Sequence, residues 1–183
     1  MKNKIKILVL AGLLSSSVYA QSDLYFGIGF NETTSKSSVN ISGTNYALKY
    51  KKNNYKALIG KRLSDSIAIE LQYADFAKEN ITENNVATVV AMSGSSIGVA
   101  GLYHFNPQSD FSPFVKLGAH SWDITAINNN TSISAKTDGT DVFYGAGVDG
   151  KINDTMKYRL EFERMEADND DIDNIGVGLL FNF

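Results

Sequence analysis

Five charged residues are the first candidates for chemistry in this sequence, because they recur on one side of segments whose other side is apolar: Glu70, Lys116, Asp149, Arg159 and Glu161. Glu70 follows Asp65 by five residues, and Arg159 follows Asp154 by five. If the two aspartates mark turns, Glu70 and Arg159 lie at the same level of the fold. An unpaired buried charge is costly, so we predict one network of carboxylate, ammonium and guanidinium groups.

Groups that could catalyse a reaction are scarce. His104 and His120 are the only histidines, and the chain has 0 cysteines. Ser121 follows His120 directly, but adjacent side chains of a strand point to opposite faces, which prevents a simple serine–histidine pair. We predict that both histidines serve as hydrogen-bonding residues, that there are no catalytic residues and that the protein is not an enzyme.

The densest acidic run is EADNDDID, residues 166–173. It lacks the glycine and the final glutamate of an EF-hand loop, so a solvated loop that collects divalent cations loosely is favoured over a dedicated calcium site. We predict no metal site and no cofactor.

The charged candidates belong to segments in which apolar residues alternate with polar or small ones, which is the pattern of a β-strand with two different faces. Phe26 and Ile28, for example, alternate with Gly27 and Gly29. Eight segments follow this rule: 24–31, 55–63, 67–73, 97–105, 115–120, 142–149, 156–163 and 175–183. A soluble barrel would place its apolar residues inside and its charges outside, but here the charges share a face with the glycines.

Short and long connections alternate along the chain. The short ones are 64–66, 106–110 and 153–155, and the long polar ones are centred on 32–44, 76–92, 123–140 and 165–174. This alternation is typical of bacterial outer-membrane barrels. We predict an all-β protein, an eight-stranded antiparallel up-and-down transmembrane β-barrel with both termini on the periplasmic side. Residues 86–92, VATVVAM, fit either a strand extension above the membrane or a short loop helix.

The first twenty residues have the features of a secretory signal peptide. Lys2, Lys4 and Lys6 precede an apolar run, and Val18-Tyr19-Ala20 offers a small-residue cleavage site. We predict a cleaved signal peptide at 1–20 and one barrel domain at 21–183. The formal net charge of -3 provides no basic surface for nucleic acid.

Four stretches resemble the small outer-membrane barrels typified by the OmpA transmembrane domain. They are GKRLSDSIAIELQYADF, SPFVKLGAHSW, GAGVDGKINDTMKYRLEFERM and the closing IGVGLLFNF. The resemblance implies that Glu70 of the third strand can pair with Arg159 of the seventh, and that Asp149 matches an acid of the sixth. The family's switching lysine on the fourth strand is replaced by Ala100, which leaves Lys116 or Lys151 as substitutes. The resemblance does not include the peptidoglycan-binding domain of full-length OmpA.

The same resemblance gives a role to the aromatic end of the sequence. In outer-membrane barrels the last strand alternates hydrophobic residues, ends in an aromatic one and is recognised by the barrel-assembly machinery. The corresponding residues here are Ile175, Val177, Leu179, Phe181 and Phe183.

We therefore predict an integral protein of the Gram-negative outer membrane with a structural and surface-contact role. Its expected partners are outer-membrane lipids and lipopolysaccharide, the assembly machinery and periplasmic chaperones, and we expect a monomer. Two alternatives remain. The first is a narrow channel of low conductance, and the second is a lipid A-modifying enzyme, since lipid A deacylases and palmitoyltransferases also use small outer-membrane barrels.

Overall fold

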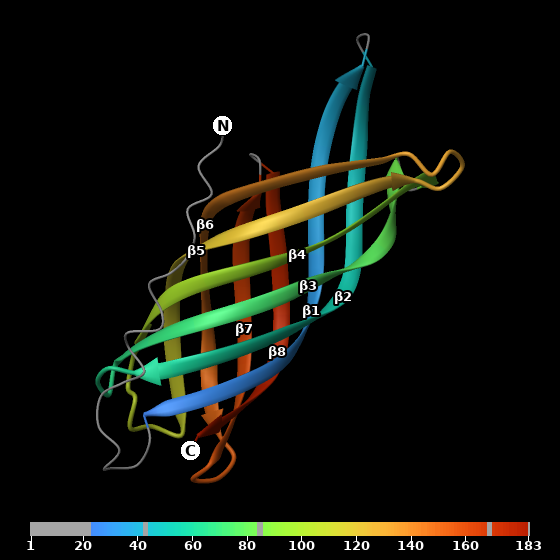
Figure 1. Ribbon diagram of the computed structural model, residues 1–183. Helices are drawn as coiled ribbons and strands as arrows, with labels where there is room; N and C mark the ends of the chain where they lie inside the picture. Colours follow the sequence, from blue (N-terminus) through green and yellow to red (C-terminus); the bar gives the residue numbers. More distant parts are fainter. Residues whose placement is uncertain (1–22, 42–43, 84–85, 168–169, 183) are drawn as a thin grey trace.

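The computed structural model describes residues 23–41, 44–83, 86–167 and 170–182. These residues form eight β-strands that close into one barrel (Figure 1). The strands are β1 (Leu24–Ile41), β2 (Thr44–Arg62), β3 (Ile67–Glu83), β4 (Val86–His104), β5 (Phe111–Asn128), β6 (Ser134–Lys151), β7 (Met156–Ala167) and β8 (Asp170–Asn182). The predicted all-β, eight-stranded, antiparallel up-and-down barrel is confirmed.

Each strand pairs antiparallel with the next one in sequence, and β8 returns to pair with β1 from Tyr25↔Asn182 to Ser35↔Ile172. The three short turns are confirmed, because β2, β4 and β6 end at Arg62, His104 and Lys151 and the following strands begin after only a few residues. Within the described ranges, no helix is long and apolar enough to cross a membrane.

The prediction of four long polar loops is wrong, because strands occupy most of those residues. β3 continues to Glu83 and β4 begins at Val86, so the run 86–92 is a strand extension and not a loop helix. Backbone hydrogen bonds between neighbouring strands do not require an apolar face, so the hairpins continue beyond the point where the apolar alternation stops. The sequence pattern marked only the part of each strand that has an apolar outer face.

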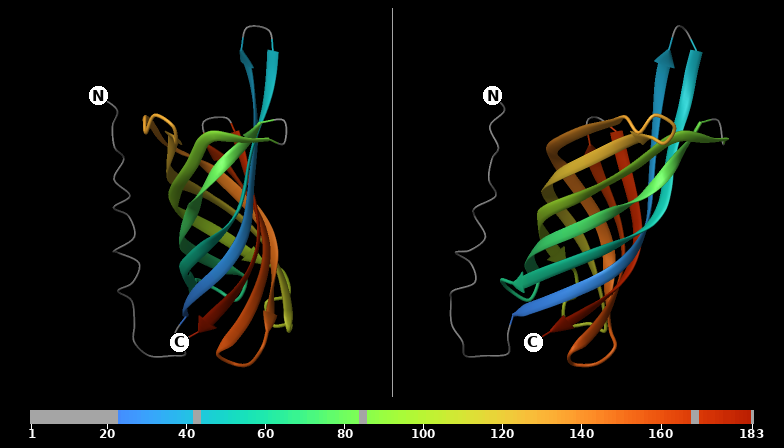
Figure 2. Two further views of the ribbon diagram at one scale, coloured as in Figure 1. Left: turned by 90° about the vertical axis from the view of Figure 1, so that its right-hand side faces the viewer. Right: turned by 45° about the vertical axis from the view of Figure 1, so that its right-hand side comes forward.

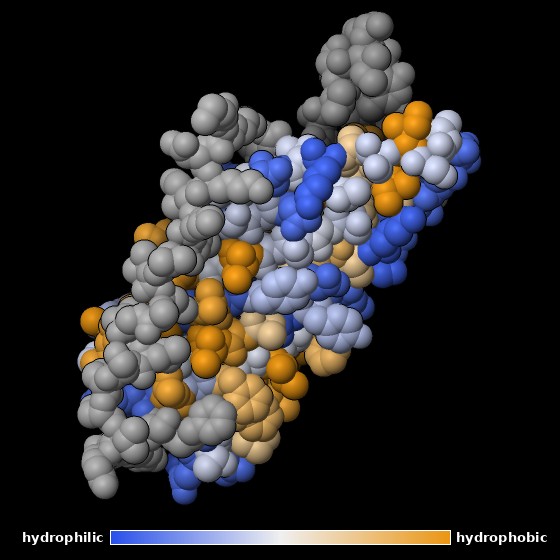
Figure 3. Space-filling model, in the orientation of Figure 1, coloured by the Kyte–Doolittle hydropathy of each residue, from blue (hydrophilic) through white to orange (hydrophobic). Residues whose placement is uncertain are grey.

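The outer surface carries a band of large apolar side chains. All eight strands contribute to it, with exposed residues that include Phe26, Ile28, Phe30, Tyr55, Ile59, Tyr73, Ile97, Tyr103, Val115, Leu117, Val142, Tyr144, Leu160, Phe162, Ile175, Val177 and Leu179. Aromatic rings pair across neighbouring strands: the ring centroids of Phe26 and Phe181 are 4.7 Å apart, and those of Phe30 and Tyr55 are 5.0 Å apart. Such a band with aromatic girdles is the surface that a lipid bilayer requires. Figure 3 shows hydrophobic side chains gathered mainly over the lower part of the visible face.

The interior changes character along the barrel axis. At the level of the outer apolar band it holds the charged side chains described below. Beyond the band it becomes more apolar, with large buried side chains that include Tyr50, Phe76, Ile81, Trp122, Met165 and Ile172. Outward positions at that end are polar, such as the paired Glu32 and Lys51. The barrel thus passes from the inside-out arrangement of a membrane protein to that of a soluble barrel within the same strands.

We expect the folded protein to resist SDS at room temperature, because the β1–β8 ladder leaves no open sheet edge at the level of the apolar band in the described residues. Boiling should unfold the barrel and change its electrophoretic mobility. The measurement is a gel of refolded protein with and without boiling, with a urea-unfolded sample as the control. Equal mobility of all three samples would contradict the architecture.

Candidate functional site in the barrel interior

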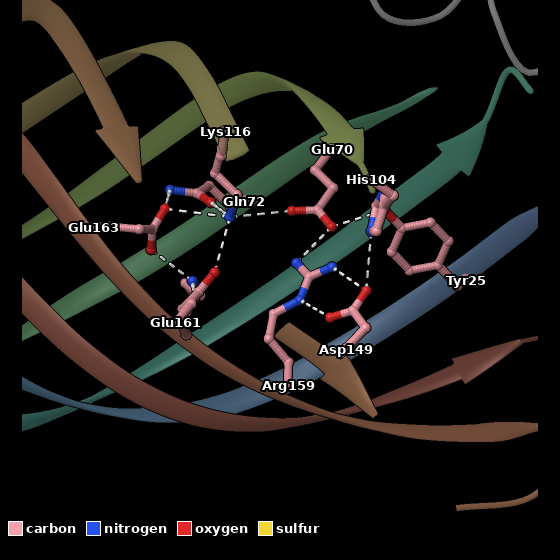
Figure 4. Close-up of polar contacts among 10 residues, drawn as sticks. Tyr25, Glu70, Gln72, His104, Lys116, Asp149, Arg159, Glu161 and Glu163 are labelled. Atoms are coloured by element: carbon pink, nitrogen blue, oxygen red, sulfur yellow. Dashed lines mark hydrogen bonds and ion pairs between the residues drawn. The ribbon is translucent and has the colours of Figure 1, made fainter. Parts of the chain in front are cut away.

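A layer of charged side chains fills the barrel at the level of the apolar band. Its members come from β2, β3, β5, β6 and β7 and point toward one another across the interior (Figure 4). Seven ionised side chains belong to it, and each is at most 8% exposed: Lys56, Glu70, Lys116, Asp149, Arg159, Glu161 and Glu163. Alternation along each strand directs these residues inward, and the intervening residues face outward.

Arg159 is the centre of one half of this network. Its guanidinium makes a bidentate ion pair with Asp149, with Nε 2.7 Å from Oδ1 and Nη2 3.0 Å from Oδ2. Its third nitrogen, Nη1, donates to Glu70 Oε1 at 2.7 Å. The guanidinium also lies 4.5 Å from the centroid of the Phe114 ring. This forked geometry uses the planar donor set of arginine, which a lysine could not reproduce.

Two further side chains complete this half. The hydroxyl of Tyr25 donates to Glu70 Oε1 at 2.7 Å, and His104 Nε2 lies 3.1 Å from Asp149 Oδ2. Each carboxylate therefore has at least two partners, which is what burial of a charge demands.

Lys116 is the centre of the other half. Its Nζ lies 3.2 Å from Glu70 Oε2, 3.1 Å from Glu161 Oε2 and 3.3 Å from Glu163 Oε1. Lys56 also contacts Glu161, and its Nζ lies 2.6 Å from Glu163 Oε2. Because Glu70 contacts both Lys116 and Arg159, it joins the two halves into one network.

The structure brings all five predicted network residues together. It also shows which lysine stands beside Glu70: Lys116 does, whereas Lys151 lies at the end of β6, 2.8 Å from Asp154 of the following turn. Sequence reasoning missed Lys56 and Glu163 as members. Both occupy the inward side of their alternating segments, so alternation carried the signal, but it could not show that they meet across the barrel.

The two histidines are buried and hydrogen bonded. His120 Nδ1 lies 2.9 Å from Ser96 Oγ, and its Nε2 lies 2.9 Å from the backbone oxygen of Glu166. Ser121 is directed elsewhere, since its hydroxyl donates to the backbone oxygen of Gly139 at 3.3 Å. In the described residues, no group of three or more histidines, aspartates or glutamates is arranged to hold a metal ion.

The network separates two hollows at the ends of the barrel. The hollow at the end with the long hairpins has a volume of about 70 Å³ and is lined by side chains that include Tyr50, Phe76 and Ile172. The hollow at the end with the short turns measures about 420 Å³ and is lined by residues that include Arg62 and Lys157. The two have no lining residue in common. The packed interior between them matches the expectation that eight strands enclose a space that side chains can fill.

Four of the five predicted assembly residues lie on the outside of β8. Ile175, Val177 and Leu179 are exposed on the apolar band, and Phe181 stacks on Phe26. Phe183 lies outside the described residues. Their role in assembly stays a prediction.

Comparison with known proteins agrees with this geometry. Residues 7–183 match the outer membrane protein β-barrel domain family, and the chain belongs to that family. A search of curated protein sequences finds no significant match. The resemblance to small outer-membrane barrels that the sequence predicted is confirmed.

Several solved structures have the same fold. They include Ail, the attachment invasion locus protein of Yersinia pestis (13% identity, TM-score 0.62), neisserial surface protein A (13%, 0.65) and the N-terminal β-barrel domain of Pseudomonas aeruginosa OprF (17%, 0.58). Each alignment covers 90% of this chain and 100% of the other. At these identities the likeness concerns the fold.

We expect the Arg159→Ala substitution to lower the free energy of unfolding by roughly 3–5 kcal/mol, because it leaves two buried carboxylates without their main partner. Adding Glu70→Ala should recover part of this loss, with a coupling energy of roughly 1–3 kcal/mol. The measurement is a double-mutant cycle by urea unfolding in lipid vesicles. Arg164→Ala, which removes a partly exposed arginine from the same strand, is the control and should have a much smaller effect. Strictly additive effects of the two interior substitutions would show that Glu70 and Arg159 do not stabilise each other.

Proposed function

We propose that this member of the outer membrane protein β-barrel domain family is a non-enzymatic structural protein that makes surface contacts through its extracellular strand extensions. One observation carries the proposal: the interior is closed by a self-paired charge network, while the strands continue far beyond the apolar band. A protein whose interior is filled has its free chemical groups on the outside. Function in such a protein is therefore concentrated in the part that rises above the membrane.

The filled interior argues against a wide pore. Water and solutes would have to pass Arg159, Lys116 and their carboxylate partners, all of which are engaged with one another. Opening a passage would require these ion pairs to separate. A channel, as the second candidate function, would conduct only in brief, small events.

The extracellular extensions are built to hold their shape. Lys52 of β2 donates to Glu79 of β3 at 2.6 Å, and this hydrogen bond lowers the pKa of Glu79. Tyr50 donates to the backbone oxygen of Ala77 at 2.7 Å, and burial raises the pKa of Tyr50 to about 12. On the other side, Arg164 of β7 holds Asp173 of β8 through Nε and Nη2, at 2.6 and 2.8 Å. Stiff hairpins can present a fixed surface to a partner at little cost in conformational entropy.

The proposed environment follows from the outer surface. The apolar band suits membrane lipid, and the polar extensions above it would stand among lipopolysaccharide headgroups. We propose a monomer that the barrel-assembly machinery inserts after delivery by periplasmic chaperones. A lipid A-modifying activity is not favoured, since His104 contacts Asp149 inside the network and His120 is engaged by Ser96 and a backbone oxygen.

We expect purified protein in planar bilayers to give no current or only small flickering events, because the charge network closes the interior. A sixteen-stranded general porin recorded under the same conditions is the control. Stable conductance of comparable size would overturn the proposal in favour of a pore.

We expect surface contacts to depend on the β1–β2 hairpin. Ser35 and Tyr50 are register partners, so residues 36–49 can be replaced by an Asn-Gly turn that joins these two positions. The shortened protein should keep its SDS resistance but lose binding to intact cells or lipopolysaccharide. Replacing residues 129–133 of the β5–β6 turn by Asn-Gly is the matched control. Undiminished binding after shortening would show that this hairpin does not make the surface contacts.

A further inference from the structure

The larger of the two hollows lies at the end of the barrel that carries the short turns. In Figure 1 and in both views of Figure 2, the turns that follow β2, β4 and β6 lie together at the lower end, where β1 begins and β8 finishes. The hollow measures about 420 Å³, which is within the size range of pockets that hold small molecules. Among the described residues that line it, Pro107 alone is apolar. A ligand of this hollow must therefore be polar.

Two cationic side chains in the lining lack a polar partner. Arg62, at the end of β2, and Lys157, at the start of β7, are both half-buried. Within the described ranges, neither side chain makes an ion pair or a hydrogen bond, and the guanidinium of Arg62 only lies 5.8 Å from the ring centroid of Tyr25. Half-buried charges of this kind gain from a counter-ion more than fully solvated ones do.

The charges around Lys157 leave it next to an uncompensated cation. Arg62, Asp149, Arg159 and Lys151 all act on it electrostatically. Asp149 and Arg159 form an ion pair with each other, and Lys151 lies 2.8 Å from Asp154. The charge of Arg62 therefore stays unbalanced, and the two cations repel each other. A carboxylate between them would turn this repulsion into attraction, and the planar donor set of arginine suits a carboxylate.

The rim of the same hollow is acidic. Asp23, before β1, and Asp110, before β5, line the hollow and are exposed. The charge of Asp110 acts on Lys151, but that lysine already holds Asp154. A simple anion would be attracted by the two cations and repelled by this rim. A molecule with a carboxylate at one end and an ammonium group at the other matches both regions.

The inner end of the hollow is closed by the charge network. Tyr25, whose ring lies beside Arg62, donates its hydroxyl to Glu70 of that network. A ligand can therefore enter the hollow without passing through the barrel. Gln108 and Asn182 also line the hollow, and their amide side chains can hydrogen bond with a peptide group.

We propose that the hollow at the short-turn end binds a short peptide with free ends, with its carboxylate at Arg62 and Lys157 and its ammonium group at Asp23 and Asp110. The orientation predicted from the sequence places this site on the periplasmic side. The site does not depend on the surface role of the hairpins at the other end of the barrel.

The test uses the mature protein in lipid nanodiscs and the dipeptide Ala-Ala as the probe, in an NMR titration. A ligand of this size should bind with a Kd of roughly 1 mM and shift the backbone amide signals of Arg62 and Lys157. Ala-Ala amide lacks the carboxylate and should bind at least about tenfold more weakly. Acetylated Ala-Ala lacks the ammonium group and should bind roughly threefold to tenfold more weakly, because the acidic rim then only repels it.

Matched variants assign the binding to the two cations. Arg62→Gln and Lys157→Gln should each weaken dipeptide binding roughly tenfold, whereas Arg62→Lys keeps the charge and should weaken it less. Lys136→Gln is the control, since it removes the same charge from an exposed lysine of the opposite end and should bind like the wild type. All four variants should keep the SDS resistance of the barrel, because none of these residues belongs to the charge network.

The remaining outcomes overturn the proposal. Unchanged affinity in both Arg62→Gln and Lys157→Gln would exclude the site. Equal binding of acetylated Ala-Ala, or inorganic phosphate that displaces the dipeptide at equal concentration, would show a site for simple anions and exclude the role of the rim. Absence of any shift at the amides of residues 62 and 157, up to dipeptide concentrations of roughly ten times the expected Kd, would show that the hollow takes no peptide.

Discussion

The narrow interior of a closed eight-stranded barrel is the constraint on which the rest of this structure depends. Such a barrel leaves room for side chains and little else, so any charge that points inward must find its partners among the other inward side chains. Arg159 meets this demand by holding Asp149 and Glu70 at once, and Lys116 connects Glu70 to the glutamates of β7. The charged side chains that look suited to catalysis in the sequence therefore pair with one another and fill the barrel interior.

A closed interior moves the available chemistry to the ends of the strands. At the border of the apolar band the polarity of the two faces of the sheet is exchanged. Outward residues become polar, and Phe76, Trp122 and Met165 pack inside. The part beyond the band is therefore organised like a small soluble barrel that continues a membrane barrel. Both parts share the same eight strands, so the membrane part is a rigid base for whatever the upper part binds.

Closure also decides where backbone hydrogen-bonding groups stay free. Inside a bilayer an unpaired strand edge would cost several kcal/mol for each unsatisfied group, and the β1–β8 ladder removes that edge at the level of the apolar band. Above the band, water can satisfy the same groups, so strands no longer have to end together. The pairing of β1 with β8 ends at Ser35↔Ile172 there, whereas its pairing with β2 continues to Ile41↔Thr44. The extension can thus expose backbone N–H and C=O groups to water, whereas the membrane part must pair all of its own.

The sequence by itself determined the properties that follow from alternation. Residues such as Phe26 and Ile28 had to face lipid because Gly27 and Gly29 share the other side, and the same rule placed Glu70 and Arg159 inward. Equal distances from the turns even put those two charges at one level. These are consequences of local geometry, since the period of two in a strand is present in the sequence whatever the strand pairs with.

Only the tertiary structure decided how far the strands run and which inward charges meet. The pairing of 86–92 with neighbouring strands needs no apolar alternation, so the residue pattern left a strand extension and a loop helix both open for this region. Lys56 and Glu163 are 107 residues apart, and their contact depends on the closure of the barrel. The choice of Lys116 over Lys151 as the lysine beside Glu70 depends on closure in the same way. Alternation fixes the side of a residue, but its partner across the barrel is set by strand register and curvature, which arise from the hydrogen bonds of the whole sheet.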